Sequence, residues 1–236
     1  MADIRTVTET GSTNDDVASL AREGALEGVW LRAERQSGGR GRQGREWLSP
    51  PGNLYASTLV RLRAEDPAAP TLALVAAVAL HEVVSIYAPG AVIKWPNDLL
   101  FNGAKLAGIL LERQGDAVIV GFGVNLAHHP DGLDRLATSL RELAGMAPEP
   151  APFLEILSRD FSRWLWRWRD EGVAPIRGAW LEAAHPLGSA LSTTEGDGLF
   201  DGLTQDGSLR LRLADGSVRV IHAGDVFLSG SPQEKA

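Results

Sequence analysis

Apolar and polar positions follow two different periods along the first half of the chain, which separates helical from extended segments. Val17, Leu20 and Ala21 have the i, i+3, i+4 spacing of one helix face. A helix is therefore predicted to begin after the capping residue Ser12. Short runs rich in apolar and hydroxyl residues, bounded by glycine or proline, predict β-strands. These strands cover residues 29–35, 53–62, 92–101, 105–113 and 117–126.

The last three of these strands are joined by Asn102-Gly103 and Gly115-Asp116, which are typical hairpin turns. Consecutive hairpins pair strands in antiparallel fashion, so the pattern argues against a doubly wound nucleotide-binding fold. The segment GFGVNL, residues 121–126, contains a Gly-x-Gly, but no helix pattern opens there. It is therefore a weak dinucleotide fingerprint.

Longer apolar patterns predict three further helices. The most apolar region, residues 69–88, is interrupted by polar residues, so we expect a buried helix rather than a membrane span. Residues 153–171 place Trp164 and Trp168 on one helix face, where core packing is the simplest role. A shorter helix is predicted over residues 175–184.

The pattern changes after residue 186, where short alternating runs and frequent glycines replace the long helical segments. Asp206-Gly207 and Asp215-Gly216 are hairpin-turn sequences. Strand signals recur about every ten residues, which predicts a small all-β barrel. We therefore expect two domains, residues 1–186 and 187–236, with a frayed tail from Ser231 onward.

Composition is that of an ordinary globular protein and narrows the chemistry. Of the 236 residues, 44% are hydrophobic and 22% are charged, which allows a sizeable core. The net charge of −7 argues against general nucleic-acid binding, which favours a basic domain. The lack of cysteine excludes disulfides, thiolate metal sites and cysteine nucleophiles. The N-terminus lacks the basic-then-apolar layout of a signal peptide, so a cytoplasmic location is expected.

The segment SGGRGRQGREW, residues 37–47, is a local basic island in this acidic chain. Glycine allows close backbone approach to a ligand and the dihedral changes of a closing loop. Arginine offers forked donors for phosphate or carboxylate oxygens, and Trp47 offers a stacking surface for a heterocycle. A solvated loop and an RNA-binding patch are alternatives, but RNA-binding segments of this kind are usually longer and repeated. A short segment between two strands favours a ligand-binding loop.

Polar residues in other segments would complete such a site. Ser12-Thr13-Asn14 opens a helix, where free N–H groups suit a small polar ligand head; simple helix capping is the alternative. In KWPNDLL, residues 94–100, Pro96 interrupts a predicted strand and forces a bulge or a kink. Such an irregularity turns neighbouring polar side chains toward a site; the alternative is a charged strand end.

Two further polar residues stand beside apolar strands. Lys105 begins a strand that is otherwise apolar up to Leu111, which places its ammonium at a sheet end. Ordinary snorkelling of the lysine is the alternative. Asn125 is a lone amide after a buried strand, and turn formation is the alternative there.

In their order and spacing, the segments STN, GRGRQGREW, KWPND, KLAGIL and GFGVN resemble the motifs of the biotin protein ligases, and the resemblance covers the whole chain. It implies an α+β fold, with a mixed sheet flanked by helices like that of the class II aminoacyl-tRNA synthetases and a small C-terminal SH3-type β-barrel. It also implies an ATP-dependent ligase. The biotin carboxylate attacks the α-phosphate of ATP, giving biotinyl-5′-AMP and pyrophosphate. A lysine of a biotin carboxyl carrier protein domain then displaces AMP.

The resemblance also implies roles for individual residues. Lys105 is the catalytic lysine between the biotin carboxylate and the α-phosphate, and Arg42 contacts both groups. Mg²⁺ enters with ATP and is held by its phosphates without a dedicated metal site, with Asp98 as the candidate protein ligand. The implied biotin-binding residues are Ser12, Thr13, Asn14, Gln36, Arg40, Gly41, Arg42, Lys105 and Gly108. The implied ATP- or adenylate-binding residues are Arg42, Arg45, Trp47, Lys94, Asn97, Asp98 and Asn125.

Bifunctional members of the family carry an N-terminal helix-turn-helix domain, for which the eleven residues before Ser12 leave no room. We therefore expect a monofunctional ligase, monomeric or homodimeric, that binds neither nucleic acid nor membrane. A lipoate ligase-like, carboxylate-adenylating enzyme and, in another class, a non-catalytic RNA-binding module are the alternative functions. Octanoyltransferases that use an acyl-cysteine are excluded because the chain has no cysteine.

Overall fold

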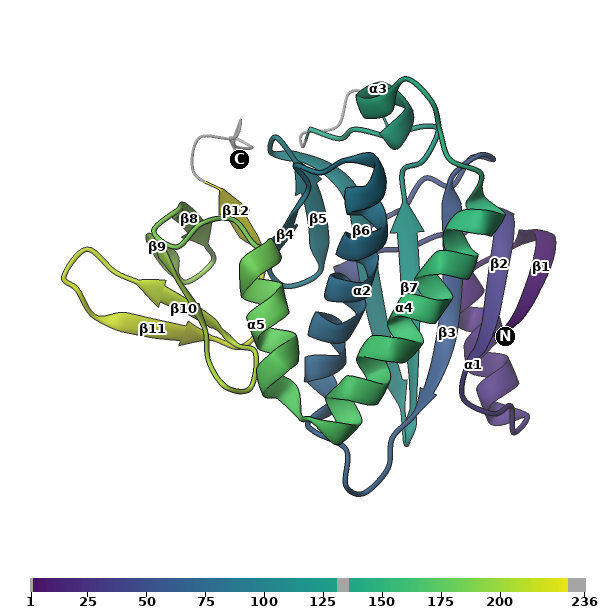
Figure 1. Ribbon diagram of the computed structural model, residues 1–236, viewed down its shortest axis with the longest axis horizontal. Helices are drawn as coiled ribbons and strands as arrows, with labels where there is room; N and C mark the ends of the chain where they lie inside the picture. Colours follow the sequence, from purple (N-terminus) through teal and green to yellow (C-terminus); the bar gives the residue numbers. More distant parts are fainter. Residues whose placement is uncertain (1, 131–135, 229–236) are drawn as a thin grey trace.

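Two β-sheets organise the fold (Figure 1). The computed structural model describes residues 2–130 and 136–228. The larger sheet is mixed, with strand order β1-β2-β3-β7-β6-β5-β4, and the smaller one is antiparallel. The strands of the larger sheet are β1 (Asp3–Thr10), β2 (Val29–Gln36), β3 (Leu54–Arg61), β4 (Val92–Lys94), β5 (Asp98–Phe101), β6 (Ala104–Gln114) and β7 (Ala117–Val124).

The edge strand β1 is not among the strands that the sequence predicts. It pairs in parallel with β2, and this pair makes the sheet mixed. Most of its residues are exposed, with Ile4 and Val7 among the partly buried ones. Because few apolar positions mark the strand, hydrophobic periodicity does not distinguish it from a polar loop. The pairs β6–β7 and β5–β6 are antiparallel, as their turn sequences predict.

Helices cover both faces of the larger sheet. One face carries α2, α4 and α5, whose apolar residues form the main core with alternate residues of the strands. On the opposite face, α1 packs in a smaller core with Leu31, Leu59 and Ile119. The helices are α1 (Thr13–Arg22), α2 (Leu72–Tyr87), α3 (Leu140–Ala144), α4 (Pro150–Asp170) and α5 (Val173–Ala183), with 3₁₀ turns at Arg42–Gly44 and Ala69–Thr71.

The buried helix predicted over residues 69–88 is confirmed as a 3₁₀ turn followed by α2. Within residues 2–130 and 136–228, Ala69–Tyr87 is the one helix long and apolar enough to span a membrane. Since 61% of its most apolar window is buried inside the protein, it serves as a core helix. The core role predicted for the α4 tryptophans is also confirmed, because Trp164 and Trp168 are 4% and 0% exposed.

The single strand predicted over residues 92–101 is wrong. The chain forms two antiparallel strands, β4 and β5, which reverse direction through Trp95, Pro96 and Asn97. Proline has no N–H to donate to a strand ladder, so pairing ends at the turn instead of passing through a bulge. The hairpin brings Lys94 and Asp98 to opposing positions at its closed end.

The smaller sheet follows α5 and has strand order β11-β10-β9-β8-β12. The predicted turns at 206–207 and 215–216 connect β9 to β10 and β10 to β11. An antiparallel C-terminal sheet is therefore confirmed, whereas the SH3-type label and the domain division at residue 186 stay predictions. The predicted tail from Ser231 lies outside the described residues. The strands are β8 (Ala190–Thr193), β9 (Gly196–Leu203), β10 (Leu209–Arg212), β11 (Val218–Ile221) and β12 (Val226–Leu228).

Candidate functional site

A pocket of about 450 Å³ lies between the start of α1, the loop 37–47, the β4–β5 hairpin and the neighbouring ends of β6 and β7. The β12 end of the smaller sheet also reaches it, through Asp225 and Val226. Every residue predicted for the site lines this pocket. These residues are Ser12, Thr13, Asn14, Gln36, Arg40, Gly41, Arg42, Arg45, Trp47, Lys94, Asn97, Asp98, Lys105, Gly108 and Asn125.

A buried carboxylate between two lysines forms the charged end of the pocket. Asp98 Oδ1 lies 2.7 Å from Lys105 Nζ, and Asp98 Oδ2 lies 3.2 Å from Lys94 Nζ. Burial opposes ionisation of Asp98, but the positive charges of Lys105 and Lys94 outweigh it and lower its pKa to about 2. Asp98 is therefore ionised at neutral pH and holds both ammonium groups beside the pocket.

Backbone pairing fixes Lys105 at the start of β6. Its N–H donates to the Leu136 carbonyl at 2.8 Å, and its carbonyl accepts from the Thr138 N–H at 3.0 Å. The Asn125 amide donates to the Thr138 carbonyl at 3.0 Å. Asn125 thus joins two backbone segments around Lys105, which agrees with a local structural role; its predicted phosphate contact stays a prediction.

Glycines on β7 form the floor of the pocket and admit two large side chains. A Cβ at Gly121 would lie 2.2 Å from Asn14 Oδ1, and a Cβ at Gly123 would lie 2.7 Å from the Trp47 indole. The Trp47 ring also lies 5.3 Å from Lys105 Nζ. The Gly-x-Gly of GFGVNL therefore permits close approach. Its sequence suggested only a weak dinucleotide fingerprint.

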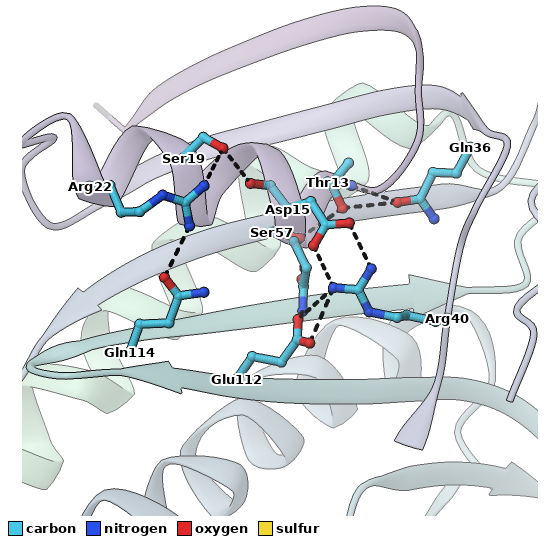
Figure 2. A network of polar contacts seen from close by, with 10 residues as sticks. Thr13, Asp15, Ser19, Arg22, Gln36, Arg40, Ser57, Glu112 and Gln114 are labelled. Atoms are coloured by element: carbon cyan, nitrogen blue, oxygen red, sulfur yellow. Dashed lines mark hydrogen bonds and ion pairs between the residues drawn. The ribbon is translucent and has the colours of Figure 1, made fainter. Parts of the chain in front are cut away.

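Another part of the pocket is lined by the uncharged polar side chains of Ser12, Thr13, Asn14 and Gln36, with Arg40 beside them. We call this part the uncharged end after those four side chains. The Thr13 N–H donates to Gln36 Oε1 at 2.8 Å (Figure 2). The Ser57 hydroxyl donates to Asn14 Oδ1 at 2.6 Å. Ser12 occupies the N-cap position of α1, but its hydroxyl makes no capping hydrogen bond. This geometry disfavours the simple capping role for Ser12.

The loop arginines are held by carboxylates and by the smaller sheet. Arg40 forms a bidentate pair with Asp15, at 2.5 and 2.7 Å, and also contacts Glu112 at 3.2 Å (Figure 2). The hydrogen bonds that Asp15 accepts from Arg40 lower the pKa of Asp15. Arg42 donates to the Asn97 amide oxygen at 3.4 Å and to the Gly224 carbonyl at 3.1 Å. Arg45 pairs with Asp225 at 3.0 Å.

Several residues at or behind the site were not predicted from the sequence. Apart from the two glycines of GFGVN, no family motif marks them, and most face the site from a different element. A polar residue within a largely apolar strand was the available signal for Ser57. The residues are Asp15, Ser49, Ser57, Glu112, Gly121, Gly123, Gly224 and Asp225.

The site combines an uncharged polar end, a glycine-lined floor and a cluster of cations around one buried carboxylate. Such a pocket suits a ligand with a neutral head and an anionic end, together with a second, phosphate-bearing ligand. Fold and site thus define an α+β protein with a pocket suited to two anionic ligands.

Comparison with known proteins identifies the family. The biotin/lipoate A/B protein ligase family matches residues 10–125, and the biotin protein ligase C-terminal domain matches residues 196–229. The biotin–[acetyl-CoA-carboxylase] ligase of Paracoccus denitrificans is 41% identical over 94% of this chain and 98% of its own length. The chain belongs to the biotin protein ligase family.

Two other relatives extend the comparison. The bifunctional ligase/repressor BirA of Bacillus subtilis is 33% identical, over 92% of this chain and 71% of its own length. The biotin protein ligase of Aquifex aeolicus, solved in complex with biotin and ATP, has a TM-score of 0.87 and 28% identity. That match covers 97% of this chain and 100% of the Aquifex chain, so the arrangement of both sheets is shared with a biotin protein ligase.

Proposed function

We propose that this protein is a biotin–[biotin carboxyl carrier protein] ligase. It activates biotin with ATP to biotinyl-5′-AMP and transfers the biotinyl group to a lysine of a carrier domain of a biotin-dependent carboxylase. The observation that carries the proposal is the placement of Lys105, Lys94 and Arg42 at one end of a pocket whose other end is uncharged and polar. The extensive match to the Paracoccus ligase supports it.

In the first step, a carboxylate oxygen of biotin bonds to the α-phosphorus of ATP. The bond from that phosphorus to the oxygen bridging the α- and β-phosphates breaks, and pyrophosphate leaves. Two anions must approach each other, so catalysis requires fixed positive charge where charge develops. Lys105 serves this purpose between the carboxylate and the α-phosphate, because Asp98 holds its ammonium in place at 2.7 Å. Arg42 contacts both reacting groups from the loop.

The uncharged end of the pocket binds the ureido and thiophene rings of biotin. A ureido group is a neutral, amide-like head, and hydroxyl and amide side chains match its donors and acceptors. The apolar valeryl chain then runs along β6 toward Lys105. The side chains that we assign to the head are Ser12, Thr13, Asn14 and Gln36, which line this end.

ATP is placed at the cationic end, with adenine stacked on Trp47 and Mg²⁺ carried by the phosphates. Among residues 2–130 and 136–228, no cluster of three or more Asp, Glu or His side chains forms a metal site. Glu46, Asp98 and Asp225 are the carboxylates that line the pocket. Asp98 is the one that contacts Lys105, but Lys94 and Lys105 already compensate its charge. It suits an auxiliary contact to Mg²⁺; when bound, the ion neutralises phosphate charge.

In the second step, the neutral amine of the carrier lysine attacks the carbonyl carbon of biotinyl-5′-AMP. The bond from that carbon to the phosphate oxygen breaks, AMP leaves, and the amine loses a proton as the amide forms. The loop 37–47 forms one wall of the pocket. We propose that this wall keeps water from the mixed anhydride until the carrier arrives.

A pyrophosphate-release assay tests the function directly. The protein is incubated with ATP and Mg²⁺ and with biotin or lipoate, and biotin alone is expected to stimulate release. Release with lipoate alone would support a lipoate ligase, and no release with either would favour a binding module. We also expect no sequence-specific DNA binding by this acidic chain, and tight binding in a gel shift would contradict that expectation.

A further inference from the structure

A continuous series of hydrogen bonds links the two ends of the loop 37–47 through the uncharged end of the pocket. Each link involves at least one side chain; the link from Thr13 to Gln36 uses the Thr13 backbone N–H, and the last link ends on the Trp47 backbone carbonyl. Glu112 accepts from the donors on either side of it. We call this series the polar chain. It comprises Arg40, Glu112, Asn14, Ser57, Thr13, Gln36, Ser49 and the backbone carbonyl of Trp47.

Glu112 is the junction of the polar chain on the Arg40 side. It accepts a hydrogen bond from Arg40 Nη2 at 3.2 Å and another from Asn14 Nδ2 at 2.6 Å. Arg40 and Asn14 line the pocket, whereas Glu112 does not. Its side chain is 35% exposed, compared with 60% for Asp15, the other partner of Arg40. Asp15 makes the closer, bidentate contact with Arg40, whereas Glu112 is the carboxylate that joins Arg40 to Asn14.

Resting on the proposed biotin ligase function, we infer that Glu112 is a positioning residue that couples binding of the ligand's neutral head to the closed geometry of the loop. It acts through Arg40 and Asn14 and touches no reacting atom. A ligand head group that binds Asn14 fixes the side-chain amide that donates to Glu112. Glu112 also accepts from Arg40, and this contact fixes Arg40 near the start of the loop.

This role differs from the direct anion contact that the sequence implied for Arg40. Asp15 and Glu112 together place two carboxylates on one guanidinium. Arg40 is thus already neutralised, while Arg42 and Arg45 have only Asp225 as a carboxylate partner among the ion pairs of residues 2–130 and 136–228. Arg40 fastens the loop, and Arg42 contacts the substrates.

The first test is steady-state kinetics of Glu112→Gln in the full chain. Glutamine has the shape of glutamate but carries no charge. Its amide N–H₂ group must face either Arg40 or Asn14, which are both donors, so one of the two hydrogen bonds is lost. We expect the KM for biotin to rise about tenfold, with kcat changed less than threefold and the melting temperature unchanged. Asp116→Asn on the same β6–β7 hairpin is the matched control. Its carboxylate pairs with Arg61, outside the pocket, and wild-type kinetics are expected.

The second test is limited trypsin digestion mapped by mass spectrometry, which requires no activity. The loop offers cleavage sites after Arg40, Arg42 and Arg45. Biotin should slow cleavage of the wild-type loop and protect the Glu112→Gln loop much less. If wild-type protein shows loop protection but releases no pyrophosphate with biotin, the proposed function fails and the coupling stands.

A double-mutant cycle separates positioning from a general structural effect. If Glu112 acts through Arg40, Arg40→Gln combined with Glu112→Gln should raise the KM for biotin no more than the worse single change. Strictly additive effects would overturn the inference. So would Glu112→Gln protein with both wild-type KM and wild-type loop protection. A variant with lower kcat and lower melting temperature but unchanged KM would assign Glu112 a merely structural role.

Discussion

The two faces of the seven-stranded sheet are built from the same strands but have opposite chemistry. On β7, Val118, Val120 and Phe122 point into the main core under α2 and α4. The alternating positions Gly121 and Gly123 face the pocket, where they admit Asn14 and Trp47. One strand thus supplies packing on one side and space on the other. Because side chains alternate between the two faces of a β-strand, residues that stabilise the core and residues that shape the pocket occupy alternate positions of the same strand.

The face that carries α2, α4 and α5 is held by ring packing and burial. Trp30 stacks on Phe122 with ring centroids 5.6 Å apart, and Phe161 meets both rings edge-on. The pocket face instead carries buried polar groups, which must be hydrogen-bonded to be tolerated. The polar chain meets that requirement by hydrogen bonds, and Asp98 is compensated by its ion pairs with Lys94 and Lys105. Substitutions on the pocket face should change activity before stability, and those on the other face should do the reverse.

Lys105→Ala gives the largest expected separation of activity from stability. Removing a cation from the reacting centre should lower the adenylation rate about 10²–10³-fold or more, because the carboxylate and α-phosphate lose their shared positive partner. Lys105 is 30% exposed and belongs to no apolar cluster, so the fold should stay intact. Buried Asp98 loses one of its two cations, so the melting temperature should fall without loss of the folded state at room temperature. Biotin-dependent ATP–pyrophosphate exchange measures the rate. Near-normal exchange would remove Lys105 from the mechanism.

Trp168→Ala tests the opposite face. Trp168 is 0% exposed, and its indole N–H donates to Thr71 Oγ1 at 2.8 Å. Truncation should lower the free energy of unfolding by about 3–5 kcal/mol, measured by urea denaturation. The adenylation rate of the folded fraction should stay within about threefold. Trp166→Ala on the same helix is the control: that side chain is 60% exposed and should cost less than ~0.5 kcal/mol.

The same division explains how much could be predicted from sequence. Period and turn residues predict β3, β6, β7, α2 and α4, because these elements bury strongly apolar faces. They do not reveal β1, which is largely exposed at a sheet edge, or the reversal at Pro96. For the site, the motif residues were predicted and all line one pocket. Glu112 and Asp225 were missed because their partners lie far away in sequence, and such pairs leave no local pattern.

Gly123→Ala asks whether the pocket floor needs glycine for space. A Cβ there would lie 2.7 Å from the Trp47 indole, so the ring must move away from its place over Lys105. Forced repacking of this kind typically costs ~1–3 kcal/mol. We expect that cost mainly in ATP binding, as a roughly tenfold higher KM for ATP.

Gly178→Ala is the control for the Gly123 change. Gly178 lies in α5 with nothing within 4 Å of an added Cβ. Alanine should stabilise that helix by ~0.5–1 kcal/mol without changing the kinetics. An unchanged KM for ATP in Gly123→Ala would show that Trp47 does not need its observed position.

The smallest expected effect is a pH dependence located away from the pocket, where α5 meets the smaller sheet. His185 is 4% exposed and packs against Phe200 with ring centroids 4.7 Å apart. Burial lowers its pKa from 6.5 to about 4, and the nearby charge of Lys94 acts in the same direction. Between pH 6.5 and 4 the unfolded chain therefore binds more protons than the folded one. The stabilisation is complete above pH 6.5 and is lost as the pH falls toward 4, on the order of 2 kcal/mol.

Urea unfolding at pH 7.5 and pH 5.0 measures this loss, and His185→Leu should reduce the difference between the two values. His222→Leu, which removes an exposed histidine of the same region, should leave the difference as in the wild type. Asp98 does not interfere: with its pKa lowered from 3.8 to about 2, its contribution is lost only below this window. Asp98 therefore stays ionised from pH 5.0 to 7.5 while the region around His185 weakens. An equal pH dependence in wild type and His185→Leu would place the titrating group elsewhere.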